Sequence, residues 1–173
     1  MRFNLLAKAG LLAAVMGIAA GPMSAMATTP PSASFEVGSL SSNLCMEAGG
    51  YTGGSSVLLD TCNGQINQKF YINRAGYAPS GQIAYTLESA KRASFQCVND
   101  INKSTAPGSA VNLEQCNGIN SAERFLMNGS QLYNIASGEC LDSSTLGQSL
   151  VLNPCNVNAA SQVWIQTPNN SQP

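Results

Sequence analysis

One pattern of cysteines and hydrophobic residues occurs three times along the chain and constrains the fold more than any other feature of the sequence. In each copy a first cysteine is followed after 15 to 19 residues by a second cysteine, and then by a Gln/Glu-x-aromatic tripeptide. The cysteine pairs are Cys45 and Cys62, Cys97 and Cys116, and Cys140 and Cys155. Because each copy is too short to bury an apolar face alone, the three copies are expected to share one core.

Hydrophobic residues stand five and three positions before each second cysteine. They are Val57 and Leu59, Val111 and Leu113, and Leu150 and Leu152. A period of two places both side chains of a pair on one face of a β-strand. Strands are also predicted at 70–72 and 83–87 around a Gly/Pro turn, and a hairpin is predicted at Asn128-Gly129. No helical periodicity persists, so the sequence predicts an all-β barrel or sandwich.

The three copies resemble the repeats of the ricin-type β-trefoil lectins. The resemblance covers about residues 35–168 and includes the Gln-x-Trp tail of that family at Gln162-Val-Trp164. The tail has diverged to Gln68-Lys-Phe70 and Glu123-Arg-Phe125 in the other two copies. The resemblance implies an all-β, ricin B-like β-trefoil with three pseudo-symmetric repeats.

Six cysteines in a chain with a secretion signal imply disulfide bonds. Six cysteines can pair in many ways, but the repeat favours pairing within each copy. The expected bonds are Cys45–Cys62, Cys97–Cys116 and Cys140–Cys155, each worth on the order of 3 kcal/mol. A metal site or a reactive thiol is the competing interpretation, and the absence of histidine and of any Cys-x-x-Cys sequence argues against it.

The first residues have the composition of a secretory signal peptide. Arg2 and Lys8 supply positive charge, residues 9–20 are apolar, and Ala25-Met26-Ala27 is a small-x-small cleavage site. A membrane anchor is the alternative, but the apolar run is shorter than the roughly 20 residues that a span needs. We therefore expect a secreted protein with no membrane span in the mature chain. The predicted segments are a signal peptide at 1–27, a flexible lead at 28–34, the trefoil domain at 35–168 and a disordered tail at 169–173.

Charge and composition argue against several classes of function. The formal net charge is −1, and −3 without Arg2 and Lys8, so no basic surface for nucleic acid is expected. The chain has no histidine, which removes Ser-His and Cys-His nucleophile pairs. The nine acidic residues are scattered and do not single out a glycosidase pair. We therefore expect no enzyme activity, no cofactor and no metal.

The resemblance implies a sugar site in each repeat, with three residue positions. They are an acid two residues after the first cysteine, an aromatic ring two before the second, and an Asn directly before the Gln of the tripeptide. In the first repeat these positions hold Glu47, Asp60 and Asn67. Tyr51, in the same turn, is a candidate for a displaced ring.

The other two repeats depart further from the family pattern. The second repeat holds Asn99, Glu114 and Ala122, with Asp100 one position away from the acid position. This repeat is expected to be the least able to bind a sugar. The third repeat holds Asp142, Asn153 and Ser161. None of the three has an aromatic residue at the stacking position.

Each candidate also has a structural interpretation. Asp142 is a candidate for capping a turn through backbone hydrogen bonds. A solvated surface position is the alternative for Asn99, Asp100, Asp60 and Glu114. Gln68, Gln162 and Trp164 are expected to pin loops and fill the core.

The leading hypothesis is a secreted, non-enzymatic lectin-like protein that binds the hydroxyl groups of a glycan in shallow repeat pockets. The alternative is a protein-interaction or delivery subunit, such as the cell-binding subunit of a toxin, because the sugar positions are degenerate and a fold does not specify function. A third, weaker hypothesis is a protease-inhibitor trefoil acting through the 74–82 loop with Tyr77 and Pro79.

Overall fold

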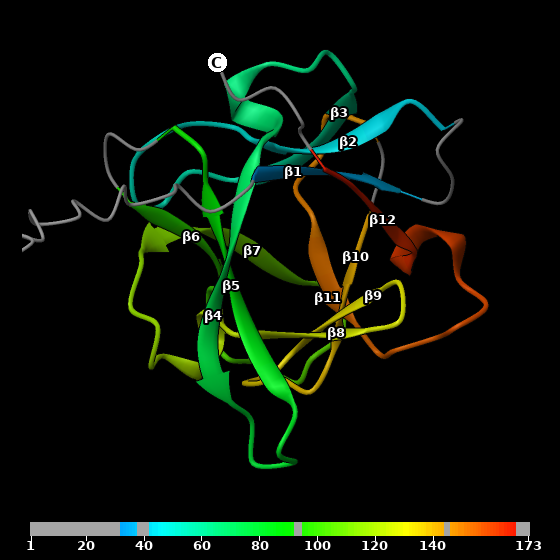
Figure 1. The fold of residues 1–173 in the computed structure, drawn as a ribbon. Coiled ribbons are helices and arrows are strands. Elements are labelled where there is room, and N and C mark those ends of the chain that lie inside the picture. The colour runs from blue at the N-terminus through cyan, green and yellow to red at the C-terminus, as the bar shows by residue number, and fades with distance from the viewer. Residues whose placement is uncertain (1–31, 38–41, 92–94, 144–145, 169–173) are drawn as a thin grey trace, which may run out of the picture.

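The computed structural model describes residues 32–37, 42–91, 95–143 and 146–168. Within these ranges the chain forms a 12-stranded antiparallel arrangement with short 3-10 helices (Figure 1). The predicted signal peptide, the first part of the predicted lead and the predicted tail lie outside the described residues.

Six strands form a barrel in which successive strands are hydrogen-bonded neighbours. In spatial order they are β12 (Trp164–Pro168), β1 (Ser32–Val37), β4 (Phe70–Tyr77), β5 (Ile83–Ser89), β8 (Phe125–Asn128) and β9 (Gln131–Asn134). The Trp164 N–H donates to the Ser130 carbonyl at 2.8 Å. This bond returns β12 to the β8–β9 turn and completes the ring.

Three hairpins join the barrel strands within the repeats. They are β2 (Leu44–Ala48) with β3 (Val57–Thr61), β6 (Gln96–Asp100) with β7 (Ser109–Gln115), and β10 (Cys140–Asp142) with β11 (Val151–Asn153). Each hairpin contacts the other two through the pairs Ser56–Asn112, Ala110–Val151 and Leu58–Ser149. A six-stranded barrel with three mutually paired hairpins is the predicted β-trefoil.

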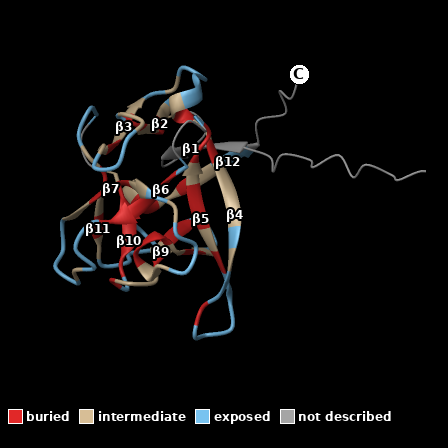
Figure 2. Cartoon of the chain, turned by 90° about the vertical axis from the view of Figure 1, so that its left-hand side faces the viewer, coloured by how far each residue is buried: buried red, intermediate tan, exposed pale blue. Residues whose placement is uncertain are grey.

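The repeat pattern of the sequence lines the core, as predicted. The six hydrophobic residues before the second cysteines are each at most 2% exposed. The residues after the first cysteines, Met46, Val98 and Leu141, are also buried, as are the aromatic residues of the tripeptides, Phe70, Phe125 and Trp164. Figure 2 shows these buried segments gathered where the barrel and the hairpins meet. All three repeats therefore contribute to one core.

The disulfide bonds join the two cysteines of each repeat, as the repeat pattern favoured. Cys45–Cys62, Cys97–Cys116 and Cys140–Cys155 have Cα–Cα distances of 5.0, 4.9 and 5.0 Å. The described residues contain no free cysteine.

The backbone follows the same path before each first cysteine. The residue two positions earlier has a left-handed conformation in every repeat: Asn43 at φ 57°, Phe95 at φ 47° and Gly138 at φ 77°. Glycine and asparagine adopt this region at low cost, whereas a bulky residue such as Phe95 rarely does. The three repeats thus share backbone geometry even where their side chains differ.

Two predicted hairpins are confirmed and one boundary differs. Strands β4 and β5 flank the turn around 78–82, and β8 and β9 flank Asn128-Gly129. Strand β1 begins at Ser32, three residues before the expected start at Phe35. Ala33 pairs with Pro168 and Phe70, and Ser34 pairs with Thr167. Residues 32–34 are therefore part of the barrel because two neighbouring strands offer them backbone partners.

Candidate functional site

The Gln or Glu that opens each tripeptide pins the loop after the second cysteine. It ends a 3-10 helix in each repeat: η1 (Ile66–Gln68), η2 (Ser121–Glu123) and η3 (Ala160–Gln162). Its buried side-chain oxygen accepts a hydrogen bond from the backbone N–H of the residue after the second cysteine. The donor and acceptor residues are Asn63 and Gln68 at 2.8 Å, Asn117 and Glu123 at 2.5 Å, and Asn156 and Gln162 at 2.8 Å. The predicted loop-pinning role is confirmed for Gln68 and Gln162, and Glu123 has it too.

In the third repeat this network reaches the predicted acid. Gln162 Nε2 donates to Asp142 Oδ2 at 3.0 Å, and Asn153 Nδ2 donates to the same oxygen at 3.1 Å. Asp142 is only 9% exposed. Two of the predicted site residues, Asp142 and Asn153, are therefore in contact, and the acid is held by two amide donors. Hydrogen bonds to an ionised carboxylate are among the stronger ones in proteins.

The first repeat has a looser version of this arrangement. Gln68 Nε2 donates to Glu47 Oε2 at 2.8 Å and also to the Thr61 carbonyl at 2.8 Å. Asp60 Oδ1 instead accepts the N–H of the next residue at 2.6 Å, which is a local backbone contact. Among the described residues, no hydrogen bond joins Asp60 to Glu47.

Asn67 and Tyr51 complete the predicted residues of the first repeat. The side-chain oxygen of Asn67 is buried and has no hydrogen-bond partner in the described part of the chain. Because this oxygen is buried, a ligand hydroxyl cannot reach it in this structure. The ring of Tyr51 lies against Lys91, whose Nζ is 3.3 Å from the ring centroid. This cation–π contact occupies one face of the ring that a sugar would need for stacking.

The second repeat has an open, polar cavity, although the sequence ranked this repeat as the least able to bind a sugar. Asn99 and Glu114 line it together with Ala122 and Glu123, and its volume is about 380 Å³. Asn99 Nδ2 donates to Asn112 at 3.0 Å, and Asn112 donates to Glu114 at 2.8 Å. Asn99 is buried, so the interpretation of this residue as a solvated surface position is wrong.

The acid and the amide have exchanged positions in this repeat. The first and third repeats carry an acid after the first cysteine and a Gln in the tripeptide, whereas the second carries Asn99 and Glu123. Burial raises the pKa of Glu123, while the N–H of Asn117 and the side chain of Asn120 lower it and Glu114 raises it further. One carboxyl group and one amide are thus retained in every repeat.

Asp100 has a structural role at the edge of the same cavity and is buried, which also contradicts a solvated surface position. Its Oδ1 accepts the N–H groups of Asn102 at 3.3 Å and of Lys103 at 3.1 Å, which caps the turn after β6. Burial raises the pKa of Asp100 despite these hydrogen bonds. Burial, and then repulsion from Asp100, also raises the pKa of Glu139. Two buried carboxyl groups from different repeats therefore have raised pKa values.

These raised pKa values predict that stability falls as the pH rises. The folded protein keeps the Glu139 proton to a higher pH than the unfolded chain does, so the stabilisation is complete below about pH 4 and is lost as the pH passes the raised value. We expect Glu139→Gln to be more stable than the wild type at pH 7 and close to it at pH 4. Urea unfolding at both pH values measures this, and an unchanged pH dependence would contradict it.

The sequence did not predict two hydrogen-bonding roles in the site, those of Asn112 and of the Gln162 amide nitrogen. Asn112, which connects Asn99 to Glu114, stands between two core residues of β7 and is itself buried. A polar residue at that position was the available signal. Gln162 was expected only to pin a loop, yet its amide nitrogen also positions Asp142. Its spacing from Asp142 in the sequence gives no hint of this contact.

Comparison with known proteins identifies the family. Residues 33–164 match the ricin-type beta-trefoil lectin domain. The chain belongs to this family. The ricin-type lectin domain is a carbohydrate-binding module. This one has three repeats, each with a disulfide bond. A search of curated proteins finds no match.

Solved structures share the fold of this lectin domain at low sequence identity. The designed three-fold symmetric protein ThreeFoil is 18% identical with a TM-score of 0.63, covering 78% of this chain and 96% of its own. The β-trefoil lectin of the Vibrio vulnificus hemolysin/cytolysin, solved with N-acetyl-D-lactosamine bound, is 18% identical with a TM-score of 0.58, covering 82% and 97%.

A plant lectin shows the same likeness over part of a larger chain. The agglutinin from Abrus precatorius is 19% identical with a TM-score of 0.60, and the match covers 80% of this chain and 48% of the agglutinin. The lectin domain described here therefore spans about half of that protein.

The described residues contain neither a cluster of metal-ligating side chains nor a helix that could span a membrane. No group of three or more His, Cys, Asp or Glu residues in this part of the chain could hold a metal ion. None of its helices is both long and apolar enough to cross a bilayer.

Proposed function

We propose that this lectin domain is a secreted, non-enzymatic protein that binds the hydroxyl groups of a glycan in the repeat pockets. The contact of Asp142 with Gln162 and Asn153 carries the proposal. A carboxylate held by two amides is a preorganised acceptor for sugar hydroxyl groups, because little side-chain freedom is lost on binding.

The three repeats would differ in their affinity for the glycan. The third has an oriented acid, the first has Glu47 on Gln68, and the second has a cavity with Asn99 on its wall. None presents an aromatic ring at the family position, so each site is expected to bind weakly. Several weak sites on one domain gain strength on a surface with many glycans through multivalency.

The chemistry of the chain supports a non-enzymatic and secreted role. The sequence has no histidine, and the cysteines of the three repeats are in disulfide bonds. Disulfide bonds persist in oxidising compartments, which agrees with the predicted signal peptide at 1–27. Both the absence of catalysis and secretion remain parts of the proposal.

Substitution of Asp142 tests the proposal. A glycan array with the oxidised chain 28–173, made multivalent, should show a related set of bound sugars. We expect Asp142→Ala to lower binding by about tenfold or more, equivalent to one lost charge-assisted hydrogen bond. Asp142→Asn is the matched control for shape, and it should bind more weakly than the wild type while remaining folded. Equal binding by all three proteins would remove Asp142 from the site.

Exposed hydrophobic residues favour a second candidate function, a protein-interaction or delivery subunit. Ile119 is 85% exposed and Val157 is 78% exposed, each in the loop after the second cysteine of its repeat. Exposed apolar side chains in the same loop of two repeats are suited to contact a protein surface. A blank glycan array together with a defined chain that co-purifies from the source would favour this function over the lectin.

A further inference from the structure

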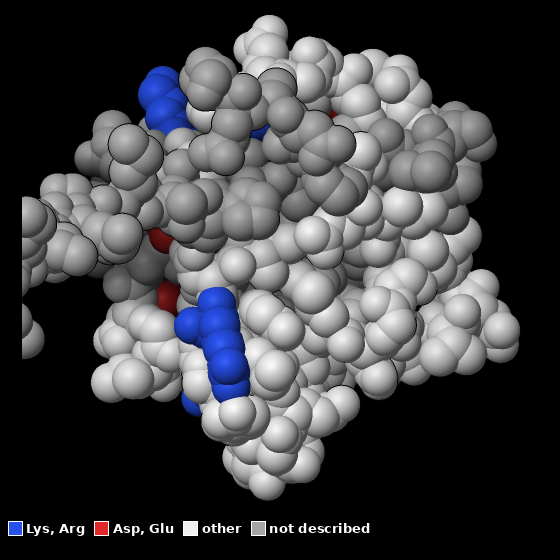
Figure 3. All heavy atoms as spheres, viewed as in Figure 1, with Lys and Arg blue, Asp and Glu red and all other residues white. Residues whose placement is uncertain are grey.

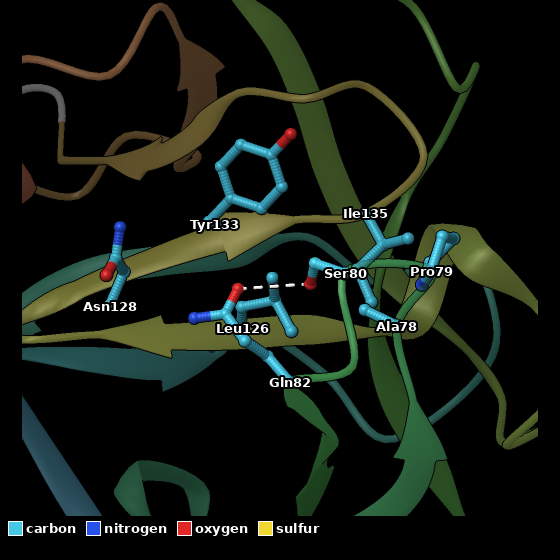
Figure 4. A pocket seen from close by; sticks show the side chains of 8 residues that line it. All are labelled: Ala78, Pro79, Ser80, Gln82, Leu126, Asn128, Tyr133 and Ile135. Carbon is cyan, nitrogen blue, oxygen red and sulfur yellow. Dashed lines mark hydrogen bonds between the residues drawn. The ribbon is translucent and has the colours of Figure 1, made fainter.

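A cavity of about 350 Å³ lies away from the three repeat sites, between two hairpins of the barrel. One wall is the turn between β4 and β5, with Ala78, Pro79, Ser80 and Gln82. The other wall is the β8–β9 hairpin and the residue after it, with Leu126, Asn128, Tyr133 and Ile135. Figure 4 shows these side chains on both sides of the space. None of them occupies an acid, aromatic or Asn position of the family pattern.

Buried contacts fix the shape of this cavity. Ala78, Ala84 and Leu126 form a small buried cluster, and Tyr133 and Ile135 pack against it. The turn is closed by hydrogen bonds from the Ala78 N–H to the Gln82 carbonyl at 2.8 Å and from the Gly81 N–H to the Ala78 carbonyl at 2.9 Å.

An arginine connects the two walls. Arg124 Nη2 donates to the Tyr77 carbonyl at 2.6 Å, and the Arg124 carbonyl accepts the Ile135 N–H at 2.9 Å. The β4–β5 turn is therefore tied to the β8–β9 hairpin, and the cavity is formed before any ligand arrives. Small-molecule sites are typically preformed cavities of about 300 Å³ or more.

The lining suits a neutral ligand with an apolar face and several hydroxyl groups. It contains an aromatic ring, Tyr133, and no Asp, Glu, Lys or Arg. In Figure 3 the tip of the β4–β5 hairpin, at the bottom of the view, is uncharged, whereas basic side chains lie above it. The Ser80 hydroxyl and Gln82 Oε1 bind each other at 3.2 Å, which leaves the Gln82 amide nitrogen as a donor (Figure 4). The Asn128 side chain is exposed on the other wall.

We propose that this cavity is an additional binding site for one pyranose ring. The ring of Tyr133 provides the apolar face that Asp60, Glu114 and Asn153 do not provide in the repeats. Ser80, Gln82 and Asn128 provide hydrogen bonds to the hydroxyl groups. The site does not depend on the repeat pockets, because it shares no residue with them.

Nuclear magnetic resonance of the oxidised chain 28–173 with methyl-labelled Leu and Ile tests this site. The probes are the methyl pyranosides of glucose, galactose, mannose and N-acetylglucosamine. We expect at least one probe to shift the methyl signals of Leu126 and Ile135 saturably, with a dissociation constant on the order of 1 mM. Absence of such shifts with all four probes would overturn the proposal.

Variants separate this site from the repeat sites. Tyr133→Leu should weaken the binding at least tenfold, and so should the double variant Ser80→Ala/Gln82→Ala, whose changes lie in an exposed turn and spare the fold. Asp142→Ala should leave these shifts unchanged, so failure of the repeat sites and failure of this site are distinguishable. Shifts that survive both variants would overturn the proposal. A proline-rich peptide that shifts Leu126 and Ile135 when no sugar does would overturn it in favour of a protein-docking role.

Discussion

Full reduction of the three disulfide bonds is expected to unfold the domain. Each bond closes a loop of 15 to 19 residues within one repeat, which is worth on the order of 3 kcal/mol, or about 9 kcal/mol for the three. Domains of this size are stable by only about 5–15 kcal/mol. Reduction therefore removes most of the free energy of unfolding. Circular dichroism and the fluorescence of Trp164, with and without dithiothreitol, measure the loss.

The bonds should be reduced in order of exposure. Cys155 is exposed, whereas Cys62 and Cys116 are half-buried. We expect Cys140–Cys155 to be reduced first, which mass spectrometry of alkylated peptides can follow. The double variant Cys140→Ala/Cys155→Ala is the matched control, and it should remain folded with a free energy of unfolding lower by about 3 kcal/mol. A native spectrum after complete reduction would contradict the expected dependence on disulfide bonds.

The fold could be predicted because the pattern of cysteines and hydrophobic residues that specifies it is local and occurs three times. The hydrophobic pair before each second cysteine has a period of two, and all six residues are in the core. The start of β1 could not be predicted, because Ser32–Ser34 carry no apolar pattern. They are ordered by backbone pairing with β12 and β4, whose residues are distant in the sequence.

The candidate site could be predicted only in part. Asp142 and Asn153 were found because both stand at fixed distances from the cysteines, and they are in contact. The contact of Tyr51 with Lys91 could not be found, because it joins two different repeats. The cavity at Tyr133 was missed for the same reason, since its walls come from hairpins about 50 residues apart.

The exchange of acid and amide in the second repeat gives a prediction about the third. We expect Gln162→Glu to lower the free energy of unfolding by about 3 kcal/mol, because it places a second carboxylate against the buried Asp142. We expect Asp142→Asn alone to cost about 1 kcal/mol, the value of a weakened hydrogen bond. The double variant Asp142→Asn/Gln162→Glu gives the third repeat the residue types that the second repeat has at Asn99 and Glu123.

A double-mutant cycle measured by urea unfolding decides whether the two positions act as one unit. The double variant should be more stable than Gln162→Glu alone, with a favourable coupling of about 1–3 kcal/mol, since the amide introduced by Asp142→Asn can donate to the new carboxylate. The matched control is Asn99→Asp/Glu123→Gln, which converts the second repeat to the pattern of the third. Additive effects in the third repeat would show that Gln162 does not position Asp142. A favourable coupling would show that the third repeat needs one acid and one amide, whichever of the two positions supplies each.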